Sequence, residues 1–509
     1  MTRNQNRVLS AVPTALSVSM GCVLVGILGL LLFAQGAYAF AYQNRSLLSN
    51  LALLPIAAVG IAALLWGSAG RKHAASHGRR PWLLRGYFLV LLAVQLLVAR
   101  SIWFYCGWDV ENIYHGADIL ARGQVFTNGD YYRLCPNNAP ITVLLAIPLW
   151  VGVRLGLAVP YAILPYLGAL MLNVTCYLCV ACARRYTKSP LAHGFALGLS
   201  TAWIALSPYM MVPYTDTYAV LFPILALYVY GSKLRSFPKW MLIAFLCFFG
   251  ASMKPTVLIF LIALAALGVA RFFARREYSP AVFGRAGLIV LALLLGAIPA
   301  KLWQSGTTAY LAGSAKPQEQ LSATHYLMLG MNAETYGGHS PEDVAFSQSF
   351  PTLEARKEAN LERAWERFTQ KSPREALHFF SVKAYKAYAD GAFAANGSLL
   401  ELEIPKRTDQ LSTFLRAIYH TKGSLNPLYS TIMQCLWLGA LALCAFAMLA
   451  QRKNPMTALL SLTLLGLTLY LLLFEVWPRY LFLYAPFFVL LASMGMEELN
   501  RVIHKKSAS

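Results

Sequence analysis

Charged residues are scarce in this sequence, and acidic residues are scarcer than basic ones. Of 509 residues only 13% are charged, with 22 Asp and Glu against 43 Lys and Arg, while 58% are hydrophobic. A soluble domain carries about 25% charged residues, so this composition excludes an ordinary soluble protein. It is typical of a membrane protein with many spans. We therefore expect an all-α polytopic membrane protein.

The excess of basic residues does not indicate a nucleic-acid partner. The net charge is +21, but the basic residues occur in short runs between apolar segments. Short loops rich in Lys and Arg mark the cytoplasmic side of a membrane protein. The charge therefore predicts topology in a lipid bilayer, and we expect no nucleic acid to bind. The runs are Arg71/Lys72/Arg79/Arg80, Arg184/Arg185/Lys188, Lys233/Arg235/Lys239, Arg271/Arg275/Arg276, Arg452/Lys453 and Arg501/Lys505/Lys506.

Few cysteines lie in polar segments. Seven of the nine fall in apolar runs, and Cys176, Cys179 and Cys182 recur every three residues without any nearby His or acid. This pattern favours buried thiols over a metal site. Only Cys106 and Cys135 share a polar loop. They are a disulfide candidate, with two unpaired thiols as the alternative.

Thirteen apolar segments are long enough to be candidate spans. The first is too long for a cleavable signal peptide, and a second follows shortly after it. If every basic run is cytoplasmic, one segment between 138 and 184 does not cross. The segment 139–158 is the weakest, because Arg154 interrupts it and a central Arg costs roughly 2.5–3.5 kcal/mol in hydrocarbon. We predict that it is re-entrant or lies on the surface, which leaves twelve spans with both termini cytoplasmic; thirteen is the alternative. The segments are 14–40, 50–70, 82–103, 139–158, 161–183, 190–207, 213–231, 240–253, 255–273, 284–303, 429–450, 455–475 and 480–497.

One long segment, 304–428, has a different composition. It holds 13 basic and 13 acidic residues and falls on the external side in this topology. Residues 354–371 read as an amphipathic helix with Leu361, Ala364, Trp365 and Phe368 on its apolar side, and Pro373 begins a second helix. We expect a small, mainly helical extracytoplasmic domain. No internal repeat suggests the paired halves of a transporter.

The first external loop, 104–138, concentrates the rare acids. It contains Asp109, Glu111, Asp118 and Asp130, and an aromatic cluster precedes them. Aromatic residues are enriched where a span leaves the bilayer, so these carboxylates are expected close to the membrane surface. An enzyme acting on a lipid-borne substrate needs carboxylates at this depth. We interpret this loop as the catalytic one.

Isolated polar residues at span ends map to the same external face. They are Asp216, Lys254, Lys301, Glu475 and Arg479. Ionisable residues at membrane depth usually mark function, although long side chains can also reach the interface without one. We assign Lys301 to the interface and Lys254 and Arg479 to function. Both cations would neutralise a phosphate, and Arg does so with two parallel hydrogen bonds.

The order of these motifs resembles the GT-C superfamily of membrane glycosyltransferases. WDVE after the first core span, a large external segment late in the chain, MKPT and the terminal EVWPRYLFLYAPFFVLLAS carry the resemblance, and GDYYRLCPNNAP is similar to a segment of Gram-positive members. The superfamily includes protein O-mannosyltransferases and bacterial enzymes that use polyprenyl-phosphate sugars. One departure is that Val110 separates Asp109 from Glu111, whereas the mannosyltransferases carry adjacent Asp-Glu.

The resemblance implies a division of the chain. Residues 1–81 form an extra N-terminal pair of spans, and 82–303 form a GT-C-like transmembrane module. Residues 304–428 form the extracytoplasmic domain, and 429–509 form the C-terminal spans with a basic cytoplasmic tail. The implied setting is a bacterial plasma membrane with the active site on the extracytoplasmic side.

The resemblance also implies a reaction. A sugar on a polyprenyl phosphate would be transferred with inversion to an external glycan, lipid or protein acceptor. Asp109 is the expected base with Glu111 second, and Lys254 and Arg479 are expected to hold the donor phosphate. No cofactor is implied, and Glu111, His115 and Asp118 on one helix face are read as solvated surface with a divalent metal as the alternative. The expected substrate-binding residues are Asp216, His325, Tyr326, Tyr132, Asn137, Asn138 and Tyr480.

Two readings from other classes compete. A lipid or glycolipid flippase would place polar residues near the bilayer midplane and show related halves, and neither is evident in the sequence. A non-catalytic subunit of cell-envelope assembly would tolerate the loss of Asp109. Substitution of this residue therefore discriminates the second reading from an enzyme.

Overall fold

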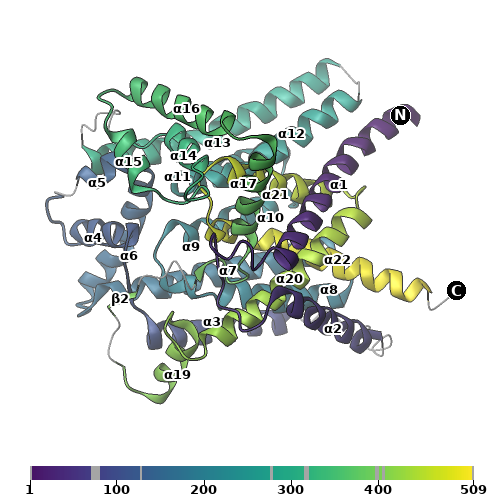
Figure 1. The fold of residues 1–509 in the computed structure, drawn as a ribbon, viewed down its shortest axis with the longest axis horizontal. Coiled ribbons are helices and arrows are strands. Elements are labelled where there is room, and N and C mark those ends of the chain that lie inside the picture. Colours follow the sequence, from purple (N-terminus) through teal and green to yellow (C-terminus); the bar gives the residue numbers. More distant parts are fainter. Residues whose placement is uncertain are drawn as a thin grey trace.

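The computed structural model describes residues 3–69, 81–126, 129–275, 279–313, 320–395, 401–403 and 407–506. These residues are helical almost throughout (Figure 1), which confirms the all-α polytopic fold expected from the sequence. The basic run 71–80 of the topology argument lies outside the described residues. The helices are α1 Arg3–Phe33, α2 Asn50–Ala69, α3 Pro81–Ile102, α4 Asp109–Ala121, α5 Gly129–Leu134, α6 Ala139–Arg154, α7 Ile163–Tyr186, α8 Pro190–Ser200, α9 Thr215–Ala219, α10 Leu221–Tyr230, α11 Ser236–Met253, α12 Leu258–Arg275, α13 Pro280–Ala312, α14 Ala323–Gly330, α15 Pro341–Gln348, α16 Leu353–Thr369, α17 Pro373–Tyr388, α19 Gln410–Tyr419, α20 Asn426–Ala450, α21 Pro455–Leu473 and α22 Ala485–Lys506.

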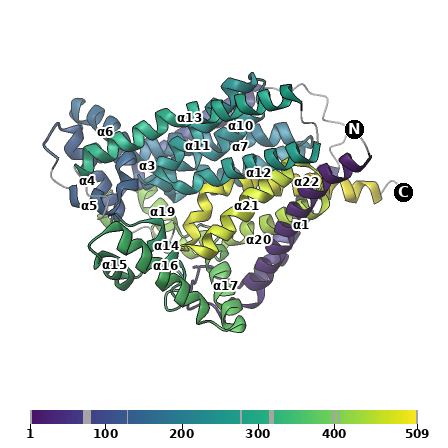
Figure 2. The same ribbon diagram turned by 90° about the horizontal axis from the view of Figure 1, so that it is seen from above.

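Eleven helices of the described chain are long and apolar enough to cross a membrane. They form one bundle, with both termini at one end and α4, α5 and α6 at the other (Figures 1 and 2). We call the second end the Asp109 end, because α4 begins there at Asp109. The first end is called the basic-loop end, since the runs at 184–188 and 452–453 lie there.

Helix directions show where the chain turns back. The ring centroids of Trp103 and Tyr161 are 5.8 Å apart, and those of Phe88 and Tyr177 are 5.4 Å apart. The two helices α3 and α7 are therefore antiparallel. The chain leaves α3 and enters α7 at the same end of the bundle, so the segment between them makes no net crossing.

Helix α6 lies in that returning segment and is among the eleven by length and composition alone. The expectation that 139–158 does not cross thus agrees with the helix directions. The reason given for it was wrong, however. Arg154 is the last residue of α6 and is exposed next to Trp150, so it does not interrupt a span.

Two shorter passes complete the bundle. Helix α8 continues through a π-helical turn, Thr201–Ala205, and the Gln95 side chain of α3 donates to the Ala205 carbonyl at 2.7 Å. The chain returns through α9 and α10, where Arg185 donates to the Tyr228 carbonyl. The chain thus crosses and comes back between Arg185 and Tyr228. With these two passes and without α6, the described helices make twelve passes.

The N-terminal pair of helices packs on the C-terminal ones. The Asn50 side chain donates to the Leu31 carbonyl, and Gln434 donates to Asn50 Oδ1 at 2.9 Å. These hydrogen bonds join α1, α2 and α20 where α2 begins. Buried amides with every strong group paired are stabilising inside a bundle that has no water to bind them.

The expected external helices are present with small shifts. Helix α16 covers Leu353–Thr369 with a Thr352 cap, and α17 begins at Pro373 after a Ser372–Glu375 capping box. Each cap pairs backbone N–H groups that would otherwise be unsatisfied. The boundary drawn at residue 304 falls inside α13, which continues to Ala312.

The apolar side of α16 is not buried as expected. Ala364 is buried, but Leu361, Trp365 and Phe368 are 47%, 66% and 42% exposed. Only one of the four predicted contacts is therefore a core contact.

A two-stranded antiparallel ladder that the sequence did not predict joins the first loop to the last part of the external segment. Strand β1 is Tyr105–Cys106 and strand β2 is Glu401–Glu403. Tyr105 pairs with Glu403 and Cys106 with Glu401. The ladder fixes the chain just before the acidic loop begins its helix.

Candidate functional site

Asp109 is the first residue of α4. The residue before it, Trp108, has φ of +52°, a left-handed conformation that is uncommon outside glycine. This turn directs the chain from β1 into the helix. The N-terminus of a helix carries unpaired N–H groups and partial positive charge, so it favours a carboxylate.

Two tyrosine hydroxyls hold the Asp109 carboxylate, one on each oxygen. Tyr131 donates to Oδ1 at 2.9 Å, and Tyr214 donates to Oδ2 at 3.0 Å. Each carboxylate oxygen can accept a second hydrogen bond. The carboxylate is therefore oriented while it retains room to accept a proton. Burial raises the pKa of Tyr131, and the Asp109 charge raises it further.

A chain of hydrogen-bonded side-chain amides extends from the Tyr131 hydroxyl. Asn138 donates from Nδ2 to the Tyr131 hydroxyl at 2.6 Å, and Asn137 donates to Asn138 Oδ1 at 3.1 Å. Asn138 is buried. The structure thus places Asn137 and Asn138, both predicted as substrate residues, in a chain of hydrogen bonds that ends on Asp109.

Tyr132, which was also predicted as a substrate residue, points away from Asp109. Its hydroxyl donates to the Asn112 carbonyl at 3.2 Å and contacts Thr142 Oγ1 at 2.9 Å. The ring is fully buried. The adjacent Tyr131 faces the carboxylate instead, because neighbouring residues of a helix point in different directions.

Lys254 and Asp216 form a buried ion pair at the same end of the bundle. Lys254 lies in the extended turn between α11 and the 3-10 helix Pro255–Val257, and Asp216 lies in α9. Asp216 is 1% exposed and Lys254 is 9% exposed. A buried pair of this kind is stable only while both partners are present.

Arg479 is enclosed by aromatic rings at the start of the 3-10 helix Pro478–Tyr484. Its Cζ lies 4.6 Å from the Trp108 ring centroid, 5.8 Å from Tyr214 and 5.4 Å from Tyr480. In the described part of the chain Arg479 forms no ion pair, and its buried Nε has no acceptor. Rings stabilise a cation without neutralising it, so Arg479 is available to an anion.

The predicted acid and the two predicted cations are therefore brought together. Tyr214 bonds Asp109, and its ring packs against Trp108 at 4.7 Å beside Arg479. Tyr480 contacts both cations, since Lys254 Nζ lies 4.8 Å from its centroid. We call this set the Asp109–Arg479 cluster. It consists of Trp108, Asp109, Tyr131, Tyr214, Asp216, Lys254, Arg479 and Tyr480.

Tyr326 approaches this cluster from the external domain. It is half-buried on α14, and burial raises the pKa of its hydroxyl. The charges of Cys135, Glu475 and Asp109 add to that rise. The charge of Asp109 therefore reaches the Tyr326 hydroxyl. That Tyr326 binds substrate stays a prediction. The neighbouring residue His325 does not approach the cluster.

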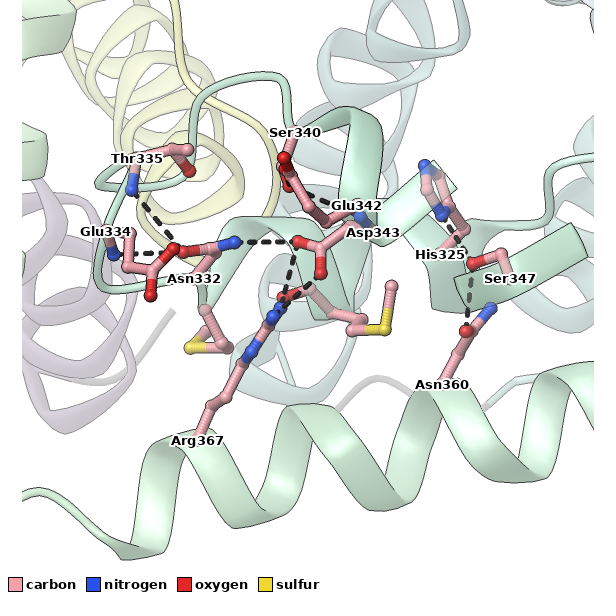
Figure 3. A network of polar contacts seen from close by, with 12 residues as sticks. His325, Asn332, Glu334, Thr335, Ser340, Glu342, Asp343, Ser347, Asn360 and Arg367 are labelled. Carbon is pink, nitrogen blue, oxygen red and sulfur yellow. Dashed lines mark hydrogen bonds and ion pairs between the residues drawn. The ribbon is translucent and has the colours of Figure 1, made fainter. Parts of the chain in front are cut away.

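His325 belongs to the interior of the external domain (Figure 3). Its Nδ1 lies 2.7 Å from Ser347 Oγ, and Ser347 donates to Asn360 Oδ1 at 3.0 Å. Because the serine hydrogen is used, His325 must donate from Nδ1. The ring is 1% exposed. The prediction that His325 contacts a donor is therefore wrong, and its role is to hold α14 against α15 and α16.

Glu111 does not join the cluster. Glu111 is exposed in the first turn of α4, His115 is exposed one turn further along, and Asp118 forms an ion pair with Arg122. In the described chain no group of three or more His, Cys, Asp or Glu side chains is arranged to hold a metal. The three side chains therefore face solvent or their own helix, and Glu111 lies outside the set of contacts around Asp109.

The predicted disulfide is not formed. Cys106 and Cys135 both lie in the described chain, and both are thiols. Cys106 is buried in β1. Cys135 lies on the Asp109 side of the loop, where burial and the Asp109 charge raise the pKa of its thiol to about 12.

The fold and the cluster define an all-α polytopic integral membrane protein in which Asp109, Asp216, Lys254 and Arg479 gather at one end of the bundle. The family model described as conserved hypothetical integral membrane protein matches residues 35–499, and the chain belongs to this family. The match begins just after α1 and includes the whole cluster. No curated protein and no solved structure matches the chain.

Proposed function

We propose that this protein is a membrane glycosyltransferase that uses a polyprenyl-phosphate sugar as donor. The observation that carries the proposal is the Asp109–Arg479 cluster. A carboxylate oriented by two hydroxyl groups shares an aromatic wall with a half-buried arginine that forms no ion pair in the described chain. A base beside a cation at the end of a transmembrane bundle suits a transfer in which an acceptor loses a proton and a lipid phosphate leaves.

The proposed step is a displacement at the anomeric carbon. The acceptor oxygen attacks this carbon, and its proton passes to the Asp109 carboxylate. The bond from the anomeric carbon to the phosphate oxygen breaks, and the electron pair leaves with the lipid phosphate. Attack opposite the leaving group inverts the configuration.

Arg479 is the main proposed ligand of the lipid phosphate. Its guanidinium is held by rings and forms no ion pair with any described residue, whereas Lys254 is paired with Asp216. Charge that develops on the leaving oxygen is stabilised most by groups that are already in place. The donor would reach this site from the outer leaflet, and its sugar would face Asp109 and Tyr326.

The setting of the proposal is the extracytoplasmic face of a bacterial plasma membrane. The acceptor would be an external glycan, lipid or protein, and it would enter from the side of α14. The basic-loop end would then be cytoplasmic, consistent with the preference of Lys and Arg for that side.

The test is a pair of substitutions in purified protein. Asp109→Asn keeps the shape and accepts hydrogen bonds but cannot take the proton, so transfer should fall by roughly 10²–10⁴-fold. Donor binding should survive. Arg479→Gln should weaken donor binding, because a charged contact to phosphate is lost. Sugar transfer from a radiolabelled polyprenyl-phosphate sugar and direct donor binding are measured for each variant.

Glu111→Gln is the matched control, because it removes a carboxylate two residues away that is exposed. Wild-type transfer by Asp109→Asn would refute the assigned base. A flippase would move labelled lipid across vesicles without any transfer, and an inactive assembly subunit would show neither donor binding nor transfer.

A further inference from the structure

A cavity opens at the basic-loop end of the bundle, opposite the Asp109–Arg479 cluster. Its volume is about 1350 Å³. Three segments line it: the turn between α7 and α8, the turn between α20 and α21, and the last turns of α22. Figure 1 shows α22 projecting past the bundle at this end, where it forms one wall.

Both acidic residues in the lining already have partners within the chain. Glu497 accepts hydrogen bonds from the backbone N–H groups of Lys188 and Ser189, just before α8 begins. Glu498 is 6% exposed and pairs with Arg501. Gln451 also donates to Glu498. Arg501 balances the charge of Glu498, whereas the hydrogen bonds to Glu497 come from neutral N–H groups and leave its negative charge in place.

Three cations in the lining form no ion pair with these acids. Lys188, Arg452 and Lys453 all line the cavity and are exposed. Among the described residues none of them forms an ion pair. With Arg501 the lining carries four cations against the two acids Glu497 and Glu498, so its net charge is positive.

The lining also contains an unpaired polar atom and, beside the cations, an apolar surface. Asn500 Oδ1 is buried, and no donor of the described chain reaches it. Leu449 and Ala450 contribute apolar surface beside the cations. A ligand that satisfied this lining would carry an anionic group, a hydrogen-bond donor such as a hydroxyl, and some apolar surface.

We propose that this cavity is a second binding site, for a phosphate-bearing ligand held by Lys188, Arg452 and Lys453. Arg and Lys both bind phosphate oxygens with short charge-assisted hydrogen bonds. The site lies at the other end of the bundle from Asp109, so it does not depend on the proposed transferase activity. The phosphate is either that of an anionic lipid headgroup or that of a soluble nucleotide.

The experiment uses the full-length protein and two probes. In nanodiscs of phosphatidylcholine, binding of phosphatidylglycerol is counted by native mass spectrometry. In detergent, binding of ADP is measured by thermophoresis. The double variant Arg452→Gln/Lys453→Gln should lower the affinity for one of these probes by at least about tenfold, because two charged contacts are lost.

Two further variants separate a built cavity from diffuse surface charge. Lys233→Gln/Arg235→Gln removes the same charge from an exposed loop at the same end, outside the lining, and should leave binding within about twofold of wild type. Ala450→Trp fills the cavity without changing charge and should reduce binding as the double variant does. Ala450 is exposed, so the larger ring does not disturb the core.

Each outcome of these measurements either supports or overturns the proposal. Binding of phosphatidylglycerol alone or of ADP alone, lost in the cavity variants, supports the site and names the source of its phosphate. Equal loss in both double variants would overturn the proposal in favour of non-specific attraction. Absence of binding to either probe by the wild-type protein, or full binding by Ala450→Trp, would overturn it as well.

Discussion

Tyr214 and Asp109 are 105 residues apart in sequence, and the tyrosine hydroxyl donates to Asp109 Oδ2 at 3.0 Å. The contact joins the first external loop to the turn before α9. It places the Tyr214 ring between the carboxylate and Arg479. One side chain therefore couples the position of the acid to the position of the cation.

Removing either hydroxyl should slow turnover while leaving the fold intact. A hydrogen bond to a charged group contributes about 1.5–3 kcal/mol, so Tyr131→Phe and Tyr214→Phe should each lower the transfer rate by roughly 10–100-fold. The loss should appear in kcat, because the carboxylate is misoriented and the phosphate site is unchanged. Transfer kinetics of the purified variants give the measurement.

Tyr132→Phe is the control for these two variants. It removes a hydroxyl from the adjacent residue, whose hydrogen bonds go to Asn112 and Thr142. It should cost about 0.5–1.5 kcal/mol of stability and leave kcat unchanged. If Tyr132→Phe slowed transfer as much as Tyr131→Phe, a general loosening of the loop would explain both.

The buried Lys254–Asp216 pair leads to a prediction about stability. Asp216→Asn leaves an uncompensated lysine in a buried site and should destabilise the protein by about 3–5 kcal/mol. The double variant Asp216→Asn/Lys254→Met removes both charges and should recover most of that loss. Thermal unfolding in detergent, at matched lipid content, measures the three variants.

Donor binding in the same variants separates a structural pair from a ligand site. Lys254→Met should weaken donor binding in the single and in the double variant if Lys254 helps to hold phosphate. Unchanged binding in the stable double variant would restrict Lys254 to a structural role and leave Arg479 as the phosphate ligand.

Hydropathy and the rarity of charge predicted much of this structure. Ionisable residues are few outside the basic loops, so each isolated one was a strong candidate, and Asp109, Lys254 and Arg479 do meet at one end. The number of passes also followed from alternating apolar segments and basic runs. These signals are local in sequence, which is why they can be read without a structure.

The side chains that complete the cluster could not be chosen in the same way. In the pair Tyr131–Tyr132 the phase of the six-residue helix α5 decides which ring faces Asp109, and no periodic apolar pattern fixes that phase. Tyr214 required a contact over 105 residues. The one available signal was its place two residues before Asp216 at a span end.

His325 is the reverse case, a residue that the sequence assigned to the site and the structure places elsewhere. A histidine near an external loop and a histidine buried against Ser347 look the same in sequence. Trp365 shows a related error. An apolar residue at helical spacing is usually a core residue, but Trp365 is 66% exposed. Burial of a side chain depends on what packs over its helix, which the sequence of the helix does not contain.

The buried His325 predicts how the external domain responds to acid. Burial lowers the pKa of His325 to about 4, below the value of about 6.5 in an unfolded chain. Between these values the unfolded state binds a proton that the folded state does not. Stability is therefore complete above about pH 6.5 and falls as the pH drops towards 4, by at most about 1.4 kcal/mol per pH unit.

The measurement is the unfolding temperature of the external domain at pH 7.5 and pH 5, followed by hydrogen exchange of α14 and α15. His325→Gln keeps a neutral donor near Ser347 and does not titrate, so its pH dependence in this range should be smaller than that of wild type. The same slope in both proteins would assign the effect to other groups, among them Asp343. Burial would raise the pKa of Asp343, but hydrogen bonds from Arg367 and Asn332 hold it below its usual range.

The helix directions predict which loops share a side of the membrane. Gln348 at the end of α15 and Lys233 between α10 and α11 are both exposed and lie at opposite ends of the bundle. In a background without native cysteines, Gln348→Cys should react with an impermeant maleimide on intact cells. Lys233→Cys should react only after lysis, because the basic loops are expected inside. Lys453→Cys, in the exposed turn between α20 and α21, provides a second site at the basic-loop end and should behave like Lys233→Cys.

Labelling of both basic-loop sites with protection of Gln348→Cys would invert the orientation and place the Asp109–Arg479 cluster in the cytoplasm. Opposite behaviour of Lys233→Cys and Lys453→Cys would contradict the twelve passes themselves.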